Sequence, residues 1–377
     1  MAKVSIVRVE DEAIFDSVRR SVDLIGGIGR FVKSGDLAVI KVNMFIKADY
    51  PTGKITDPRA VIAVARLAAE QGATVKVVER TANIYADFAQ FPEIGNYAEV
   101  ISVDNLPHRH LTVPGAESLR VELSIPDIVT QCDVFINMPS LRTHALTLMS
   151  GALKNLMGIL PGAQPGYVHL CGLEQSIVDL NLFRPSNLVV MDAIYTLQGN
   201  FPCEGSPLKT DLILAGDNAV AVDTISALLL GFQPAKIVHL MEAKRRKLGP
   251  IEPDRIELLG ESLEDVAGQI RLEKAPSSYE VFRGRFTIID SSACNSCRQA
   301  LAGGLVAASH REGFEKVKDL TIITGPMEKE PGPKTENVVL YGNCTCRYRH
   351  IGNYIQGCPP LAGQAAEAIL SVVEKRR

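Results

Sequence analysis

The sequence predicts an α/β protein with a mostly parallel sheet domain, followed by a smaller flavodoxin-like α/β domain. Runs of β-branched residues alternate with helical patterns, which is typical of parallel strands joined by helices. A more polar stretch at 251–282 interrupts this alternation, and the pattern starts again after it. A chain of 377 residues is long enough for two cores. We therefore expect one domain in residues 1–275 and a second in residues 276–377.

One strand–helix–strand unit in the first domain is well marked. LAVIKVN (37–43) and TVKVVE (74–79) are the predicted strands, and the segment between them predicts a helix. Asp57 suits its N-cap, Pro58 its first turn and Gly72 its end. The other strands expected here are residues 4–9, 133–139, 187–194 and 211–216, and a helix is expected at 219–232.

The second domain is expected to bring distant cysteines together. Cys294 and Cys344 each follow a predicted strand, and Cys358 precedes the last predicted helix. Ligands of open α/β sheets bind at the carboxyl ends of strands, so we expect Cys294, Cys297, Cys344 and Cys358 to converge there. The predicted strands are 285–290, 320–325 and 337–342, and the predicted helices are 299–317 and 361–377.

The apolar patterning of the sequence favours a cytoplasmic protein. MAKVSIVRVEDEAIF lacks the apolar core of a secretory signal, and no apolar run reaches the roughly 18 residues of a membrane span. Thiols stay reduced in the cytoplasm, so clustered cysteines suggest metal or redox chemistry rather than disulfides. A net charge of −3 gives no indication of a nucleic-acid surface.

Four thiolates suit either zinc or an iron–sulfur cluster. Zinc ribbons usually contain two C-x2-C pairs, whereas this chain has one such pair, a C-x-C and a Cys-Pro-Pro. A cysteine followed by proline recurs at cluster sites. We therefore expect a 4Fe-4S cluster bound by Cys294, Cys297, Cys344 and Cys358, with Cys346 as an alternative to Cys344. Small buried residues or occasional thiols are the other interpretation of these cysteines.

The order C-x2-C, G-x-C and G-C-P-P resembles the cluster-binding subunit of nickel–iron hydrogenases and the related small subunit of respiratory complex I. In that family a flavodoxin-like domain holds a 4Fe-4S cluster at the same sheet edge. The resemblance implies the type of cluster.

An ordered set of motifs marks the first domain: KVN (41–43), ITDP (55–58), RTH (142–144), LKNLMG (153–158), His169, MDAI (191–194) and GDNAVAVD (216–223). Together they resemble the domain-of-unknown-function family numbered 362, over about residues 35–235. Members of that family often carry a C-terminal iron–sulfur module, commonly ferredoxin-like, and the cysteine pattern here differs from that module.

Four polar residues are the candidate catalytic groups of this domain. His144 can exchange a proton near neutral pH, and Lys154 can bind an anion or act as a nucleophile. Asp192 ends a predicted strand and can orient a histidine or lysine. A weaker similarity to the nickel-pincer lactate racemase domain implies that His144, Lys154 and His169 line one site. A hydrogen-bonded core histidine and a solvated helix end are the structural alternatives.

We expect an iron–sulfur protein that acts as a redox enzyme or electron-transfer protein on a small anionic molecule. Its partners would be that small molecule or a redox protein, with no nucleic acid and no membrane. The alternatives are a non-redox cluster enzyme (a hydro-lyase or racemase-like enzyme) and a non-catalytic metal-binding maturation or binding protein. Enzymatic activity and a homodimer are left open by the sequence. The chain has no Walker A motif and no G-x-G-x-x-G after a strand, so nucleotide binding is unsupported.

Overall fold

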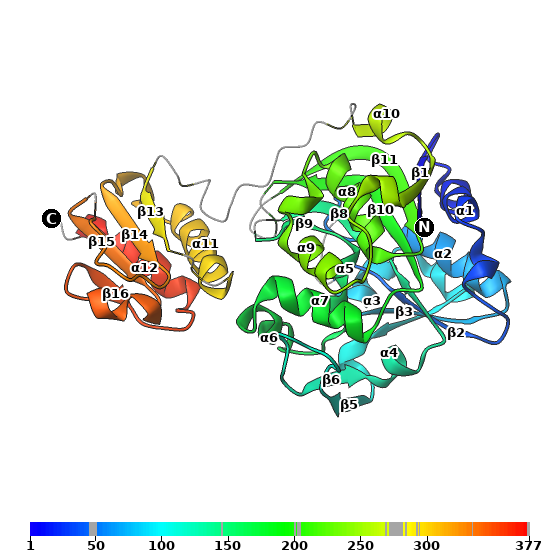
Figure 1. Cartoon of the computed structure of the whole chain (residues 1–377), viewed down its shortest axis with the longest axis horizontal. Coiled ribbons are helices and arrows are strands. Elements are labelled where there is room, and N and C mark those ends of the chain that lie inside the picture. The colour runs from blue at the N-terminus through cyan, green and yellow to red at the C-terminus, as the bar shows by residue number, and fades with distance from the viewer. Residues whose placement is uncertain are drawn as a thin grey trace. The chain divides into compact units, whose positions relative to one another are not determined.

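The computed structural model describes residues 1–44, 51–144, 146–199, 201, 205–267, 270, 282, 285–291, 293, 295–333 and 335–374. The chain divides into two compact units, an N-terminal unit within residues 1–275 and a C-terminal unit within residues 276–377. Both units consist of a sheet with packed helices (Figure 1). The predicted α/β class, with a mostly parallel large sheet and a smaller parallel sheet, is confirmed.

The large sheet of the N-terminal unit has the strand order β12-β1-β11-β10-β7-β2-β3-β4, and β8 pairs with both β10 and β9. Most neighbours are parallel, but β11 is antiparallel to β1 and to β10, and β9 is antiparallel to β8. The strands are β1 (Ala2–Arg8), β2 (Leu37–Lys41), β3 (Thr74–Glu79), β4 (Glu99–Ser102), β7 (Val134–Asn137), β8 (Ser140–His144), β9 (Leu148–Ser150), β10 (Leu188–Gln198), β11 (Ser206–Gly216) and β12 (Ile256–Gly260). A separate antiparallel pair is formed by β5 (His108–Leu111) and β6 (Leu123–Pro126).

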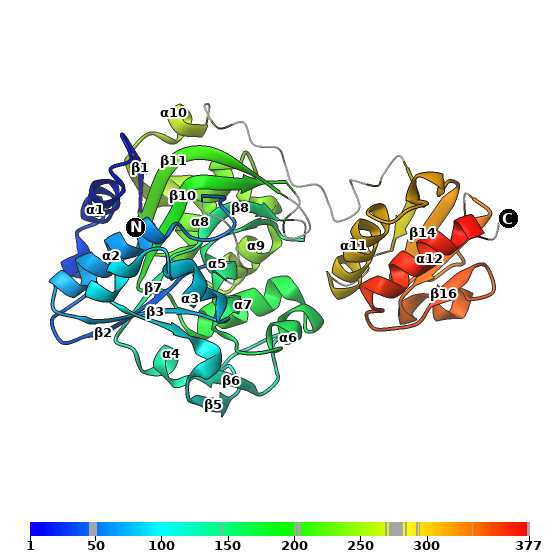
Figure 2. The same cartoon turned by 180° about the vertical axis from the view of Figure 1, so that it is seen from behind.

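Helices cover both faces of this sheet (Figures 1 and 2). Successive strand residues point to opposite faces: Ile40 packs in one core with α1 and α2, and Val39 packs in the other with α7 and α8. The central strands are therefore buried on both faces and mostly apolar, as expected for a parallel sheet between two helical layers. The helices are α1 (Ile14–Leu24), α2 (Pro58–Glu70), α3 (Asn83–Phe88), α4 (Asp127–Gln131), α5 (Ala152–Asn155), α6 (Pro165–Leu170), α7 (Leu173–Phe183), α8 (Ala219–Leu229), α9 (Val238–Arg245) and α10 (Leu263–Ala267).

The helix α2 forms where the capping residues predicted it. Asp57 is the N-cap, and its side chain accepts a hydrogen bond from the Arg59 N–H at 2.9 Å. Pro58 occupies the first turn, where its missing N–H removes no helical hydrogen bond. The chain leaves the helix at Gly72, whose φ of +89° favours glycine.

The C-terminal unit contains a fully parallel sheet with the order β13-β14-β15-β16. Its two long helices pack on the same face, where Leu301, Leu305 and Ile369 share a core with strand residues. The elements are β13 (Thr287–Asp290), α11 (Asn295–Ser309), β14 (Leu320–Thr324), β15 (Asn337–Tyr341), the 3-10 helix η9 (Asn343–Tyr348), β16 (Asn353–Ile355) and α12 (Ala362–Glu374). In neither unit does a described helix have the length and apolarity that crossing a membrane requires.

Candidate functional site

The predicted catalytic residues come from four elements of the N-terminal unit. His144 ends β8, Lys154 lies on α5, His169 on α6 and Asp192 on β10. The charges of Lys154 and His169 both act on the ring of His144. These three side chains therefore lie within electrostatic range of one another, whereas Asp192 belongs to a different group of contacts, described below.

Hydrogen bonds from two neighbouring helices fix the backbone that carries Lys154. The Asp223 carboxylate on α8 accepts from the N–H groups of Ala152, at 2.6 Å, and Leu153, at 2.9 Å. The Asn181 side chain on α7 donates to the Leu153 carbonyl at 2.7 Å. A helix of one turn has little stability of its own, so these bonds determine where Lys154 is placed.

Gly151 leaves room for the capping carboxylate, because a Cβ at this position would overlap Asp223 Oδ1. Burial raises the pKa of Asp223 to about 6, although the N–H groups that it accepts from and the nearby His239 lower it. The AVD segment (221–223) thus supplies the carboxylate that caps α5. Gly151, which directly precedes α5, leaves the space that this carboxylate occupies.

His144 is a neutral imidazole at physiological pH. Its ring is buried, and its Nδ1 accepts a hydrogen bond from the Leu146 N–H at 3.1 Å. The proton of the neutral ring is therefore on Nε2. Burial lowers the pKa of His144 well below its usual value, and Lys154 and Arg142 lower it further. His144 can consequently donate a hydrogen bond through Nε2 without carrying a charge.

Lys154 and His169 are half-buried, and both have lowered pKa values. Burial and the charge of Arg142 lower the pKa of Lys154 to about 7, while Glu174 acts in the opposite direction. Burial and the charge of Lys154 lower the pKa of His169 to about 4. At neutral pH His169 is neutral and Lys154 is divided between amine and ammonium, so Lys154 can accept or donate a proton.

Arg142 adds a permanent positive charge to these surroundings. It lies two residues before His144 on β8 and is 2% exposed. Its Nη1 donates to the Lys54 carbonyl at 3.1 Å, and its guanidinium carbon lies 4.2 Å from the centre of the Phe201 ring. Burial lowers the pKa of Arg142 to about 10, which leaves it charged at neutral pH. A buried guanidinium beside Lys154 suits an anionic ligand.

Two further residues belong to this region, and sequence reasoning missed both. His239 on α9 lies with its Nδ1 2.8 Å from Glu174 Oε2 on α7. The charge of His239 acts on His144, and the charge of Glu174 acts on Lys154. The local signal for His239 is its position between Val238 and Leu240, whereas Glu174 is followed by polar residues and gives no such signal. The two residues are 65 positions apart, and only the fold pairs them. We call His144, Lys154, His169, Arg142, Glu174 and His239 the basic cluster.

The KVN and LKNLMG motifs meet in a buried ion pair. Lys41 Nζ lies 2.9 Å from Glu79 Oε2, and both side chains are almost fully buried. The Asn155 side chain donates to the Lys41 carbonyl at 3.2 Å. A Cβ at Gly158 would lie 2.5 Å from Lys41 Nζ and 2.6 Å from Glu79 Oε1. These motif residues therefore join β2 and β3 to the segment that carries Lys154.

Asp192 lies with Asp57 at the start of α2. Its carboxylate accepts from the Asp57 N–H at 2.7 Å and from the Ile194 N–H at 3.0 Å. Burial, and then the charge of Asp57, raises the pKa of Asp192 to about 7, and burial raises the pKa of Asp57 to about 7. Two carboxyl groups that act on each other through their charges titrate as a pair. The role of Asp192 in orienting a histidine or lysine stays a prediction.

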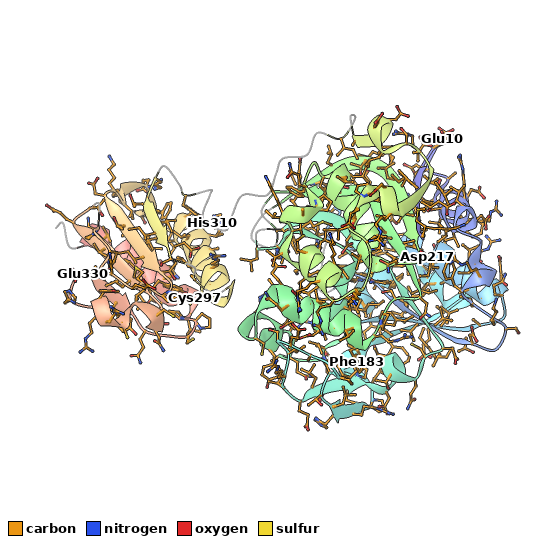
Figure 3. The ribbon with its side chains drawn as sticks, in the orientation of Figure 1. Glu10, Phe183, Asp217, Cys297, His310 and Glu330 are labelled. Atoms are coloured by element: carbon orange, nitrogen blue, oxygen red, sulfur yellow. The ribbon has the colours of Figure 1, made fainter. Side chains whose placement is uncertain are left out.

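In the C-terminal unit, Cys297 lies on α11 (Figure 3) and is buried. A Cβ at Gly342, directly after β15, would lie 3.2 Å from Cys297 Sγ. The Asn343 N–H donates to the Gly357 carbonyl at 2.8 Å, and the Gly357 N–H donates to Asn343 Oδ1 at 2.9 Å. The loops after β15 and β16 are thereby held together next to Cys297.

Cys344, Cys346 and Cys358 are exposed thiols on these loops, and Cys294 lies outside the described residues. Within the described part of the chain, no three His, Cys, Asp or Glu side chains are placed to hold one metal ion. Thiols are the donors that a 4Fe-4S cluster requires, but one of the four predicted ligands is not described. The cluster site with Cys294, Cys297, Cys344 and Cys358 therefore stays a prediction.

The chain belongs to the family described as Domain of unknown function (DUF362), whose model matches residues 38–227. The resemblance predicted from the motifs over about residues 35–235 is thus confirmed. The matched range includes His144, Lys154, His169 and Arg142 of the basic cluster, and His239 lies beyond it.

Among curated proteins, the chain is similar to the thylakoid-associated protein sll1697 of Synechocystis sp. (strain ATCC 27184 / PCC 6803 / Kazusa), with 27% identity over 262 residues. The match covers 66% of this chain and 80% of that protein. Among solved structures, the lactate racemase apoprotein from Thermoanaerobacterium thermosaccharolyticum aligns with a TM-score of 0.41 and 11% identity, covering 99% of this chain and 90% of that chain. Similarity at this level does not bear on mechanism. The cytoplasmic location stays a prediction.

Proposed function

We propose that the N-terminal unit is an acid–base enzyme that binds a small anion beside Arg142 and Lys154 and transfers a proton there. The observation that carries this proposal is the gathering of a permanent cation, a lysine with a pKa of about 7 and neutral imidazoles in one largely buried place. Positive groups buried together destabilise a fold, whereas an anionic ligand would offset their charge. Perturbed titration of this kind is typical of functional sites.

Each group has a distinct role in the proposal. Arg142 binds the anionic group of the ligand, since a guanidinium is matched to carboxylates and phosphates. Lys154 takes the proton as an amine and returns it as an ammonium, because its pKa lies near the working pH. His144 donates its Nε2–H to the ligand, and burial strengthens that hydrogen bond. This mechanism belongs to the non-redox alternative that the sequence left open.

Ligand binding by the full chain tests the proposal. Thermal unfolding is followed at pH 7 with 2-hydroxy acids, amino acids, dicarboxylates and inorganic phosphate. A ligand at about 100 times its Kd stabilises the folded state by about 2.7 kcal/mol, which raises Tm by several degrees. We expect at least one anion to do so for wild type and for the exposed control Arg19→Met, but not for Arg142→Met. No stabilisation by any of these classes would exclude the anion site.

We also propose that the C-terminal unit holds the predicted 4Fe-4S cluster, which would make redox chemistry a second candidate function. The support is the placement of Cys297 beside two joined loops, each of which carries a further cysteine. When bound, the cluster would supply one-electron transfer. Protein purified without oxygen should contain about four irons and four sulfides per chain and give a reducible EPR signal. Zinc without sulfide would contradict this assignment.

A further inference from the structure

A fully buried histidine in the basic cluster has one ring nitrogen without a partner. His239 is 0% exposed, and its Nδ1 forms a 2.8 Å hydrogen bond with Glu174 Oε2. Its Nε2 has no hydrogen-bond partner among the described residues. A buried polar atom in this state destabilises the fold unless something pairs with it. Because a carboxylate holds the proton of the neutral ring on Nδ1, the Nε2 lone pair is a proton acceptor.

The Glu174 carboxylate is shared between His239 and Lys154. It bonds the histidine directly, and its charge raises the pKa of Lys154 against the effect of burial. The helix α7, which carries Glu174, packs against both α5 with Lys154 and α9 with His239. The negative charge of Glu174 thus interacts with two groups, Lys154 and His239, that can each carry a positive charge.

The other charged or titratable groups near His239 come from the elements around α9. The helix α8 contributes Asp223, whose pKa His239 lowers, and β8 contributes His144. The short 3-10 helix before α9 contributes the exposed Lys236. The Asp223 oxygens accept the two N–H groups of α5, which leaves Glu174 as the hydrogen-bonded acid of His239.

We propose that Glu174 and His239 are the proton-holding partner of Lys154, an inference that rests on the proposed function. The Glu174 carboxylate stabilises a positive charge on either Lys154 or His239. When Lys154 Nζ releases a proton, His239 Nε2 takes it up, and the net charge of the three groups is unchanged. The reverse transfer restores the ammonium. His239 is then a positioning residue, because it exchanges a proton with Lys154 and does not touch the ligand.

The test follows the titration of Lys154 in the full chain. Trace acetic anhydride labels neutral amines, and the labelling rate of Lys154 is measured by mass spectrometry from pH 5 to 9. In Glu174→Gln we expect the rate at pH 6 to rise, by at most about tenfold, because about a tenth of Lys154 is already neutral there. In His239→Gln we expect the curve to sharpen to a single-proton titration, since the wild-type curve is broadened by the second proton.

A matched control is the exposed pair His110–Glu122, in which His110 Nδ1 lies 3.5 Å from Glu122 Oε1 on the surface. His110→Gln should leave the Lys154 curve unchanged. A purely structural role of His239 would lower Tm without altering that curve. If Lys154 titrates near pH 7 in wild type but both cluster variants reproduce the wild-type curve, the inference is overturned and the proposed function stands. If wild-type Lys154 titrates as an ordinary lysine, the proposed function itself fails.

A measurement on wild type avoids any dependence on the folding of the variants. Nitrogen-15 NMR of the histidine rings reports which nitrogen carries a proton. We expect the neutral His239 ring to hold its proton on Nδ1, beside Glu174, and to leave Nε2 unprotonated. A neutral ring that carries its proton on Nε2 would overturn the inference, because Nε2 could then accept no proton from Lys154.

Discussion

The lowered pKa of Lys154 makes its amine unusually reactive at neutral pH. With a pKa of about 7, half of the Lys154 side chains are neutral at pH 7, compared with about 4 in 10,000 for an ordinary lysine of pKa about 10.4. The neutral fraction is thus about 1,000 times larger. A less basic amine is also a weaker nucleophile, by about 30-fold here if amines follow the slope known for thiols. The expected net gain in acylation rate is therefore roughly 40-fold.

Competitive labelling with trace acetic anhydride measures this gain directly. Peptides that contain Lys154 and Lys209 are quantified in the same digest, and Lys209, with 54% of its side chain exposed, serves as the reference for reagent access. We expect Lys154 labelling to be half-maximal near pH 7 and to level off above about pH 8.5. A Lys154 rate that still rises about tenfold per unit at pH 9 would refute the reasoning, because it would show an ordinary ammonium.

The lowered pKa of Lys154 also makes the free energy of unfolding depend on pH. The pKa of Lys154 is lower in the folded chain than in the unfolded chain, so the unfolded chain binds more protons between about pH 7 and 10.4. The contribution of Lys154 to the free energy of unfolding is therefore lowest below pH 7, and it rises between about pH 7 and 10.4. Lys154→Met should stabilise the chain at pH 6 by on the order of 2 kcal/mol, after allowance for its partial exposure. If the Tm of Lys154→Met at pH 6 were equal to that of wild type or lower, this prediction would be contradicted.

The remaining predictions concern three other places in the fold. Gly158→Ala should destabilise the chain by about 1–3 kcal/mol, because its Cβ would displace the ends of the buried Lys41 and Glu79 side chains. The exposed Gly95→Ala, with open space at its Cβ, is the control in chemical denaturation. The carboxyl pKa of Asp57 is raised in the folded chain, so stability falls as pH rises from about 4 through 7. Asp57→Asn, which keeps a capping oxygen, should reduce the difference in Tm between pH 5 and pH 8; an unchanged difference would count against the pairing with Asp192. Cys358→Ser should remove most of the iron and sulfide from protein purified without oxygen, whereas full retention would exclude Cys358 as a ligand.

The helices and strands that the sequence could predict are marked by residues within them or directly beside them. The helix α2 is marked by its capping Asp57, its Pro58 and the Gly72 beyond its end, all within one short segment. The apolar strands β2 and β3 on either side are equally local. Where a strand lies between two helical layers, its run of β-branched residues identifies it without knowledge of its neighbours.

Long-range pairing explains what the sequence could not predict. The strands β10 and β11 extend beyond their apolar runs, and their polar ends are paired through Thr196 Oγ1 and Thr210 Oγ1 at 2.9 Å. That antiparallel pairing depends on a partner strand and not on local composition. His239 and Glu174 were missed for the same reason, since each is an ordinary helix residue until α7 and α9 pack.

The candidate site was predicted in part. His144 and Lys154 were recognised because they follow one predicted strand end in a motif. Arg142, in the same RTH segment, was not singled out, because only the fold shows that its charge is buried beside them. The lowered pKa values of these groups result from their burial together, which a linear pattern does not contain.

The central claim is proton transfer at the basic cluster, and solvent exchange of carbon-bound hydrogen tests it most directly. The full chain, purified without oxygen, is incubated in D2O at pH 7 with the small carboxylates that raise its Tm, and the α-proton signals are followed by NMR. We expect at least one of these signals to be replaced through C–H to C–D exchange, with a rate at least about 100-fold lower in Lys154→Met and unchanged in Lys209→Met. Exchange that persists at the wild-type rate in Lys154→Met, or its absence with every bound carboxylate, would contradict the account.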